Sequence, residues 1–165
     1  MTPVSPRGLL LGKLTPYVLL ATVEMLIILA LMVGLFGVPI QGNLMLLFAL
    51  SFLFILTVLG LGLLISTLAK TQLQAMQFSL LIMLPSVLLS GFVFPRSEMP
   101  WPLYAIGGIL PVTYFLQILR GIVLRSADAL DLFPNIIGLV ICCVAILAIS
   151  LSRFRKQLDY GHSNM

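Results

Sequence analysis

The sequence predicts an all-α membrane protein, a polytopic helix bundle with about four spanning helices and an external re-entrant helical hairpin. Two observations support this class. Of the 165 residues, 61% are hydrophobic and 8% are charged, whereas an average soluble domain is about 25% charged. Uncharged apolar runs recur along the chain, and several approach the roughly 20 residues with which a helix crosses about 30 Å of hydrocarbon. Residues 1–165 are therefore predicted to form a single transmembrane domain.

The first span is predicted at residues 16–36. Its helix is expected to begin near Ser5, because Pro6 suits a first helical turn. Glu24 lies about a third of the way into the span. A carboxylate in lipid is costly, so it should face the bundle interior or water. Two interpretations stay open: a residue of the translocation path or gate, or an interfacial or protonated glutamate bonded to a neighbouring helix.

The second span is predicted at residues 44–68. Gly62 and Ser66 lie four residues apart near its end. This spacing of small residues permits close approach of two helices in a membrane. Apolar segments also contain this pattern by chance.

The third span is predicted at residues 75–94. Pro85 lies within it and should kink the helix, because proline removes one backbone bond and clashes with the preceding turn. A hydroxyl at Ser86 or Ser90 is expected to bond a carbonyl that the kink leaves free.

The stretch at residues 101–124 is predicted to form the re-entrant hairpin. Its two apolar pieces, Trp101–Leu110 and Val112–Leu119, are separated by Pro111. Each piece is too short to span the membrane as a helix. Broken backbone survives at membrane depth only where protein or water satisfies it. The segment between Pro95 and Pro111 is a candidate external gate.

Arg120 follows the second piece and is expected to anchor it at the external interface by pairing with a carboxylate such as Glu98. Aromatic residues often lie at headgroup level, and we expect this of Trp101, Tyr104 and Tyr114.

The fourth span is predicted at residues 132–151 and contains Cys142 and Cys143. Both are interpreted as small buried hydrophobic residues. A metal site would need further ligands at suitable spacing, and the only histidine, His162, lies in the polar tail. We therefore expect no cofactor, no metal site and no catalytic constellation in this chain.

The basic residues lie at the ends of the spans, which argues against a nucleic-acid partner. They also predict the orientation. With the N-terminus inside, six of the nine Lys and Arg residues are cytosolic and three are external. Four spans then return the C-terminus to the cytosol. This distribution follows the tendency of cytoplasmic loops to be positively charged.

Three stretches of the sequence resemble the membrane domain of ABC-2-type transporters, the permease half of bacterial export systems. The first is Thr2-Pro3-Val4-Ser5-Pro6 with Leu10-Leu11-Gly12-Lys13, and the second is Gly60–Gln72 with Gln74–Gln77. The third comprises Leu89–Pro95, Met99-Pro100, Pro111–Phe115 and Leu119–Gly121. They follow one another in the family's order and spacing.

The resemblance implies a permease subunit in the bacterial inner membrane, with both termini cytoplasmic. Such a subunit forms a homo- or heterodimer and docks on a separate cytosolic ABC ATPase, which hydrolyses the ATP. Its substrate is expected to be hydrophobic or amphipathic and to move outward. The four spans correspond to the family's last four, so this chain resembles the C-terminal portion of a permease.

Other readings are a truncated or accessory membrane subunit without transport activity of its own, and a membrane enzyme, which the lack of a catalytic constellation disfavours. Six residues are the candidates for the translocation path or gate: Glu24, Pro85, Gly91, Pro95, Pro111 and Arg120.

Overall fold

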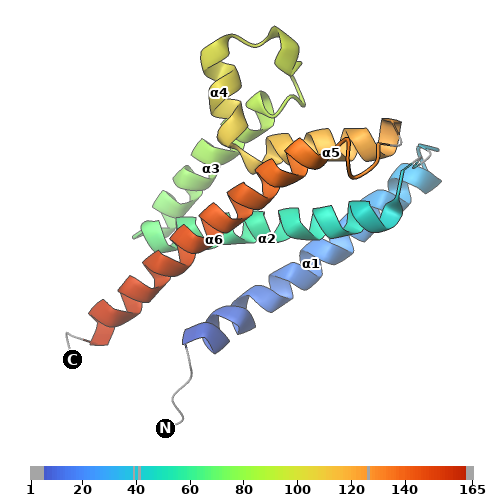
Figure 1. The fold of residues 1–165 in the computed structure, drawn as a ribbon. Helices are drawn as coiled ribbons and strands as arrows, with labels where there is room; N and C mark the ends of the chain where they lie inside the picture. Colours follow the sequence, from blue (N-terminus) through green and yellow to red (C-terminus); the bar gives the residue numbers. More distant parts are fainter. Residues whose placement is uncertain (1–5, 39, 41, 126, 163–165) are drawn as a thin grey trace.

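The computed structural model describes residues 6–38, 40, 42–125 and 127–162, and every regular element in this part of the chain is helical. Figure 1 shows the helices as a splayed bundle with both termini toward one end. The elements are α1 (Pro6–Gly34), α2 (Leu44–Leu68), α3 (Gln72–Leu89), the short 3₁₀ helix η1 (Arg96–Glu98), α4 (Trp101–Ile109), α5 (Pro111–Arg125) and α6 (Phe133–His162).

Four helical segments are long and apolar enough to cross a membrane, and they confirm the polytopic all-α fold. They are Leu14–Gly34, Leu44–Leu68, Gln72–Leu89 and Phe133–Arg153. The helix of the first span begins at Pro6, as predicted. The second span coincides with the predicted range. Asn43 accounts for its start, because its side-chain oxygen accepts the backbone N–H of Met45 at 2.9 Å.

The third span differs from the predicted range at both ends. Its helix begins at Gln72, capped by the Thr71 hydroxyl, which accepts the backbone N–H of Gln74 at 3.2 Å. It ends at Leu89 instead of residue 94. Gly91 has φ +93°, a left-handed conformation that glycine adopts readily and that a helix cannot continue through.

Pro85 lies inside α3. Proline at this position leaves the carbonyl of Leu81 without its helical donor. The Ser86 hydroxyl donates to the next carbonyl, that of Ile82, at 2.6 Å. The Ser90 hydroxyl donates to the Val87 carbonyl at 3.1 Å. Neither serine bonds the carbonyl that Pro85 leaves free, so the expectation that one of them does is wrong.

The core lies where α2, α5 and α6 meet, and α2 packs more extensively against α6 than any other pair of helices does. The buried residues of this core are Leu47, Leu50, Ile118, Ile122, Val123, Leu132 and Leu139. A Cβ on Gly60 would lie 2.7 Å from the side chain of Leu147, so Gly60 permits the close approach of α2 and α6. Gly62 has no neighbour within 4 Å of that position, so within this chain Gly60 and not Gly62 lies at a close helix contact.

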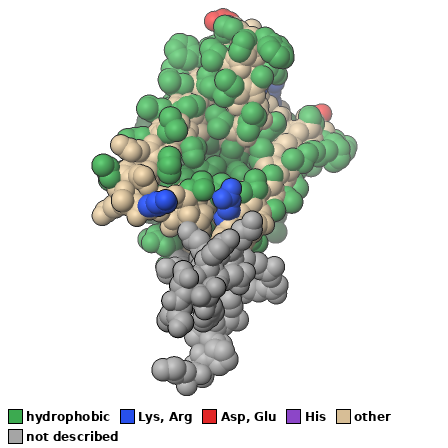
Figure 2. Space-filling view, turned by 90° about the vertical axis from the view of Figure 1, so that its left-hand side faces the viewer, with side chains coloured by type: hydrophobic (Ala, Val, Ile, Leu, Met, Phe, Trp, Pro, Cys, Tyr) green, Lys and Arg blue, Asp and Glu red, His purple; other side chains and the backbone are tan. Residues whose placement is uncertain are grey.

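Helix α1 lies at the edge of the bundle. In the most apolar part of its span no residue is buried. The helix that it contacts most is α2. Its connection to α2 turns at Gly37, which has φ +60° and nothing packed within 4 Å of its Cβ position. The space-filling view shows a largely hydrophobic face, with basic side chains along its lower edge (Figure 2).

Candidate functional site

Helices α4 and α5 meet at a corner of 88°. The two apolar pieces predicted from the sequence are therefore both helical, and they form a right angle instead of lying antiparallel. Pro111 is the first residue of α5, where its missing N–H costs no helical bond. Leu110 before it is extended, with φ −83° and ψ 127°, as a residue preceding proline tends to be.

The end of α4 is completed by hydroxyl groups from α5. The last carbonyls of a helix have no partner within the helix. Here the Thr113 hydroxyl donates to the Gly107 carbonyl at 2.6 Å, and the Tyr114 hydroxyl donates to the Gly108 carbonyl at 2.7 Å. Thr113 is fully buried. The corner therefore carries its own partners for backbone groups that lipid would leave unsatisfied.

Helix α6 supports the same corner from a third side. The Cys142 thiol lies 3.7 Å from the Ile109 carbonyl, within reach of a weak sulfur hydrogen bond. A Cβ on Gly138, one turn earlier, would lie 2.4 Å from the Tyr114 ring, so only glycine allows the ring to lie there. Tyr114 and Cys142 thus build the corner. Cys143 is a buried free thiol as predicted, whereas Cys142 is only partly buried, so its interpretation as a buried residue is wrong.

A second set of contacts joins the end of α3 to α5. Gly91 is buried, and its carbonyl accepts a hydrogen bond from Nη2 of Arg120 at 3.1 Å. Arg120 thus anchors α5, as expected, but its partner is this carbonyl and not the Glu98 carboxylate. A Cβ on Gly107 would lie 2.7 Å from the backbone oxygen of Leu89, so α4 also lies directly against the end of α3.

Arg96 ties η1 to α4. Its Nη2 donates to the Tyr104 carbonyl at 3.2 Å, and its guanidinium carbon lies 4.3 Å from the centroid of the Tyr104 ring, in the range of cation–π attraction. Pro95 is the residue that precedes η1. The segment between Pro95 and Pro111 is therefore held by side chains at both ends.

Glu24 lies in a different place, an apolar pocket of about 270 Å³ between α1, α2 and α5. The side chain of Glu24 is exposed, and Ser51 is the buried hydroxyl opposite it in the lining. The rings of Phe54 and Phe115 stack in this lining with centroids 4.2 Å apart. The pocket offers one carboxylate and one hydroxyl within an apolar surface, which suits an amphipathic ligand.

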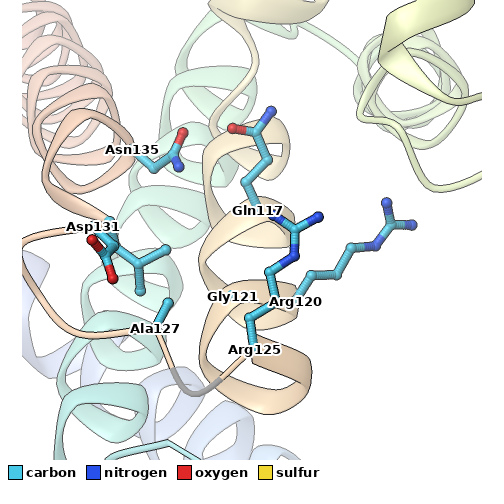
Figure 3. A pocket seen from close by; sticks show the side chains of 8 residues that line it. Gln117, Arg120, Gly121, Arg125, Ala127, Asp131 and Asn135 are labelled. Atoms are coloured by element: carbon cyan, nitrogen blue, oxygen red, sulfur yellow. The ribbon is translucent and has the colours of Figure 1, made fainter.

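A more polar pocket of about 490 Å³ lies between α5 and the start of α6. Figure 3 shows the arginines of α5 on one side and Asp131 and Asn135 on the other. Its lining residues are Gln117, Arg120, Gly121, Arg125, Ala127, Asp131, Leu132 and Asn135. The sequence did not reveal this pocket, because its two walls are separated by the loop after α5.

The structure therefore brings Gly91 and Arg120 into direct contact, with Pro95 and Pro111 at the two ends of the intervening segment. Glu24 shares its pocket with Leu119, the neighbour of Arg120 in α5. Pro85 lines neither pocket. The hydroxyls of Thr113 and Tyr114 were not predicted as functional groups, although both follow the Pro111 break directly.

Comparison with known proteins identifies the family. The profile of the ABC-2 type transporter family matches residues 1–124. The chain is 36% identical to the probable multidrug ABC transporter permease YbhS of Escherichia coli (strain K12), across 96% of this chain and 42% of that protein. It is 30% identical to the inner membrane transport permease YhhJ of the same strain, across 94% of this chain and 42% of that protein.

A more distant relative is ABC transporter G family member 20 of Dictyostelium discoideum, which is 25% identical across 94% of this chain and 22% of that protein. No solved structure matches the chain. The chain spans about two-fifths of the length of the bacterial permeases that it matches. The family match, the bacterial relatives and the apolar spans agree, and the chain belongs to the ABC-2 type transporter family as a multi-pass membrane protein.

Proposed function

We propose that this chain forms part of the membrane pathway of an ATP-driven exporter for hydrophobic or amphipathic substrates. The observation that carries the proposal is the family match over residues 1–124. The name of YbhS, a probable multidrug ABC transporter permease, supports this substrate class. The mainly apolar pocket around Glu24 supports it independently, because it combines a carboxylate with stacked aromatic rings.

The partners in this proposal are a separate cytosolic ABC ATPase and a second permease chain, in a homo- or heterodimer. ATP binds and is hydrolysed on the ATPase. We place both termini in the cytoplasm. The turn between α2 and α3 and the C-terminal part of α6 lie toward the same end of the bundle as the termini (Figure 1). The first of these segments contains Lys70, and the second contains Arg153. Basic residues favour the cytoplasmic side.

In this orientation the corner between α4 and α5 is the re-entrant element, entering from the external side. The contacts of Thr113, Tyr114 and Arg120 hold it as a preformed unit. We propose that it acts as the external gate. A cysteine introduced at Ser97, which is exposed, should then be labelled by a membrane-impermeant reagent from outside at a rate that depends on the nucleotide state. Equal labelling rates with and without nucleotide would contradict the gate.

The experiment that tests the whole proposal is purification of the tagged chain from native membranes in mild detergent, with identification of its partners and an ATPase assay. Recovery of an ATPase whose activity changes with this chain would support a coupled permease. Recovery of the chain without any ATPase would instead favour an accessory membrane subunit that does not transport. Glu24→Gln in the recovered complex then tests whether the carboxylate contributes to transport.

A further inference from the structure

The polar pocket between α5 and α6 has a position and a charge pattern that the proposed transport function does not explain. The apolar span of α6 begins at Phe133, and the pocket is lined by Asp131, Leu132 and Asn135 on either side of that point. A Cβ on Gly42, just before α2, would lie 2.6 Å from the Ile122 carbonyl of α5. The pocket therefore lies at the level where the spans end, which is the level of lipid headgroups.

One wall of the pocket is cationic. Arg120 and Arg125 both project from α5, and their guanidinium groups extend to the same side of that helix (Figure 3). Within the described residues neither of them forms an ion pair, and the bond of Arg120 to the Gly91 carbonyl uses one of its five N–H donors. The amide of Gln117 lies on the same wall. Guanidinium groups bind phosphate oxygens with two parallel hydrogen bonds.

The opposite wall carries the Asp131 carboxylate and the Asn135 amide from α6 (Figure 3). A purely anionic ligand would be repelled by this carboxylate. A ligand with a phosphate at one end and an amine at the other would match both walls. The volume of about 490 Å³ lies within the range of small-molecule sites.

Three apolar side chains that are adjacent in sequence to lining residues of the pocket are exposed. Leu124, Leu130 and Phe133 are 63%, 85% and 58% exposed, although they flank a polar site. Exposed leucine and phenylalanine side chains at the end of a membrane span provide a surface for acyl chains. We propose that this pocket binds the headgroup of a zwitterionic glycerophospholipid, with the phosphate against Arg120 and Arg125 and the amine against Asp131. Binding of the headgroup at this site does not require that the same lipid is a transported substrate.

The test is a binding titration with phosphatidylethanolamine that carries a fluorophore on an acyl chain. The protein is the full chain, purified with its partner chains in mild detergent. Arg125→Gln should weaken binding about tenfold, because a charge-assisted bond to phosphate is lost. Arg153→Gln is the matched control, since it removes one exposed arginine at the other end of α6 and should change the Kd by less than about twofold.

Asp131 provides a second measurement. Wild-type protein should prefer phosphatidylethanolamine to phosphatidylglycerol, and Asp131→Asn should reduce this preference by about two- to fivefold, as for one exposed ion pair. Equal effects of Arg125→Gln and Arg153→Gln, or an unchanged preference in Asp131→Asn, would overturn the proposal. Displacement of the labelled lipid by an equal concentration of inorganic phosphate would identify a site for soluble phosphate and would also overturn it.

Discussion

The hydroxyl of Thr113 provides the sharpest test of the corner between α4 and α5. Thr113→Val keeps the shape of the side chain and removes its bond to the Gly107 carbonyl, which measures 2.6 Å. That carbonyl then keeps only the longer bond from the backbone N–H of Leu110, at 3.3 Å. Thr113 is fully buried, so water cannot replace the lost donor.

The expected loss of stability is about 1–2 kcal/mol. An under-satisfied buried polar group costs about 1–3 kcal/mol, and side-chain hydrogen bonds measured in a membrane protein average about 0.6 kcal/mol with a maximum near 1.7. For a chain of this size each kcal/mol lowers the melting temperature by about 2–4 °C, so the expected fall in Tm is about 2–8 °C.

Thr57→Val is the matched control. Thr57 is also fully buried, and its hydroxyl donates to the Leu53 carbonyl at 2.8 Å. The Leu53 carbonyl lies within α2 and also accepts the helical backbone N–H of Thr57. Loss of the Thr57 hydroxyl therefore leaves this carbonyl with a partner and should shift the Tm by only about 2 °C or less. The assay is thermal unfolding of the purified variants in detergent, followed by size-exclusion chromatography. Equal shifts for the two variants would refute the argument that the corner depends on the Thr113 bond.

Three further substitutions test the other contacts. Gly107→Ala places a Cβ 2.7 Å from the Leu89 backbone oxygen and should lower the Tm, whereas Gly62→Ala meets no atom within 4 Å; similar Tm values would contradict the close approach. Glu24→Gln should lower transport by the assembled complex with little change in Tm, and unchanged transport would exclude a path role. Arg120→Ala loses a charge-assisted bond worth about 1–3 kcal/mol and should lower both Tm and export; wild-type values of both would remove its anchoring role.

The spanning helices were predictable because a helix that crosses the hydrocarbon of a membrane needs a long apolar segment. For α2 the predicted first and last residues are those observed. The end of α3 was not, since the left-handed backbone at Gly91 stops the helix inside a run that remains apolar to Phe94. Hydropathy records composition and carries no information about φ. The break at Pro111 was predicted from proline chemistry, but its 88° angle depends on side chains from α5 and α6.

The contacts of the candidate site were less predictable than the fold. Arg120 was expected to form an ion pair with a carboxylate, because acidic residues lie near it in the sequence. Its actual partner is a carbonyl that becomes available only because α3 ends early. In the sequence, Thr113 and Tyr114 are residues of an apolar run with no distinguishing pattern. Their hydrogen bonds to α4 depend on the angle between α4 and α5, which the sequence does not give.

The position of α1 has a consequence for how the Glu24 pocket can change its size. Two walls of this pocket belong to α2 and α5, which are fixed to each other and to α6 by the core. The third wall is α1, which has no buried residue in its apolar window and joins α2 through the unpacked turn at Gly37. Leu29 and Met32 of α1 pack against that core as partly buried residues. A swing of α1 about Gly37 would therefore break the contacts of these two residues and leave those among α2, α5 and α6 intact, so α1 is the wall whose displacement would change the width of the pocket.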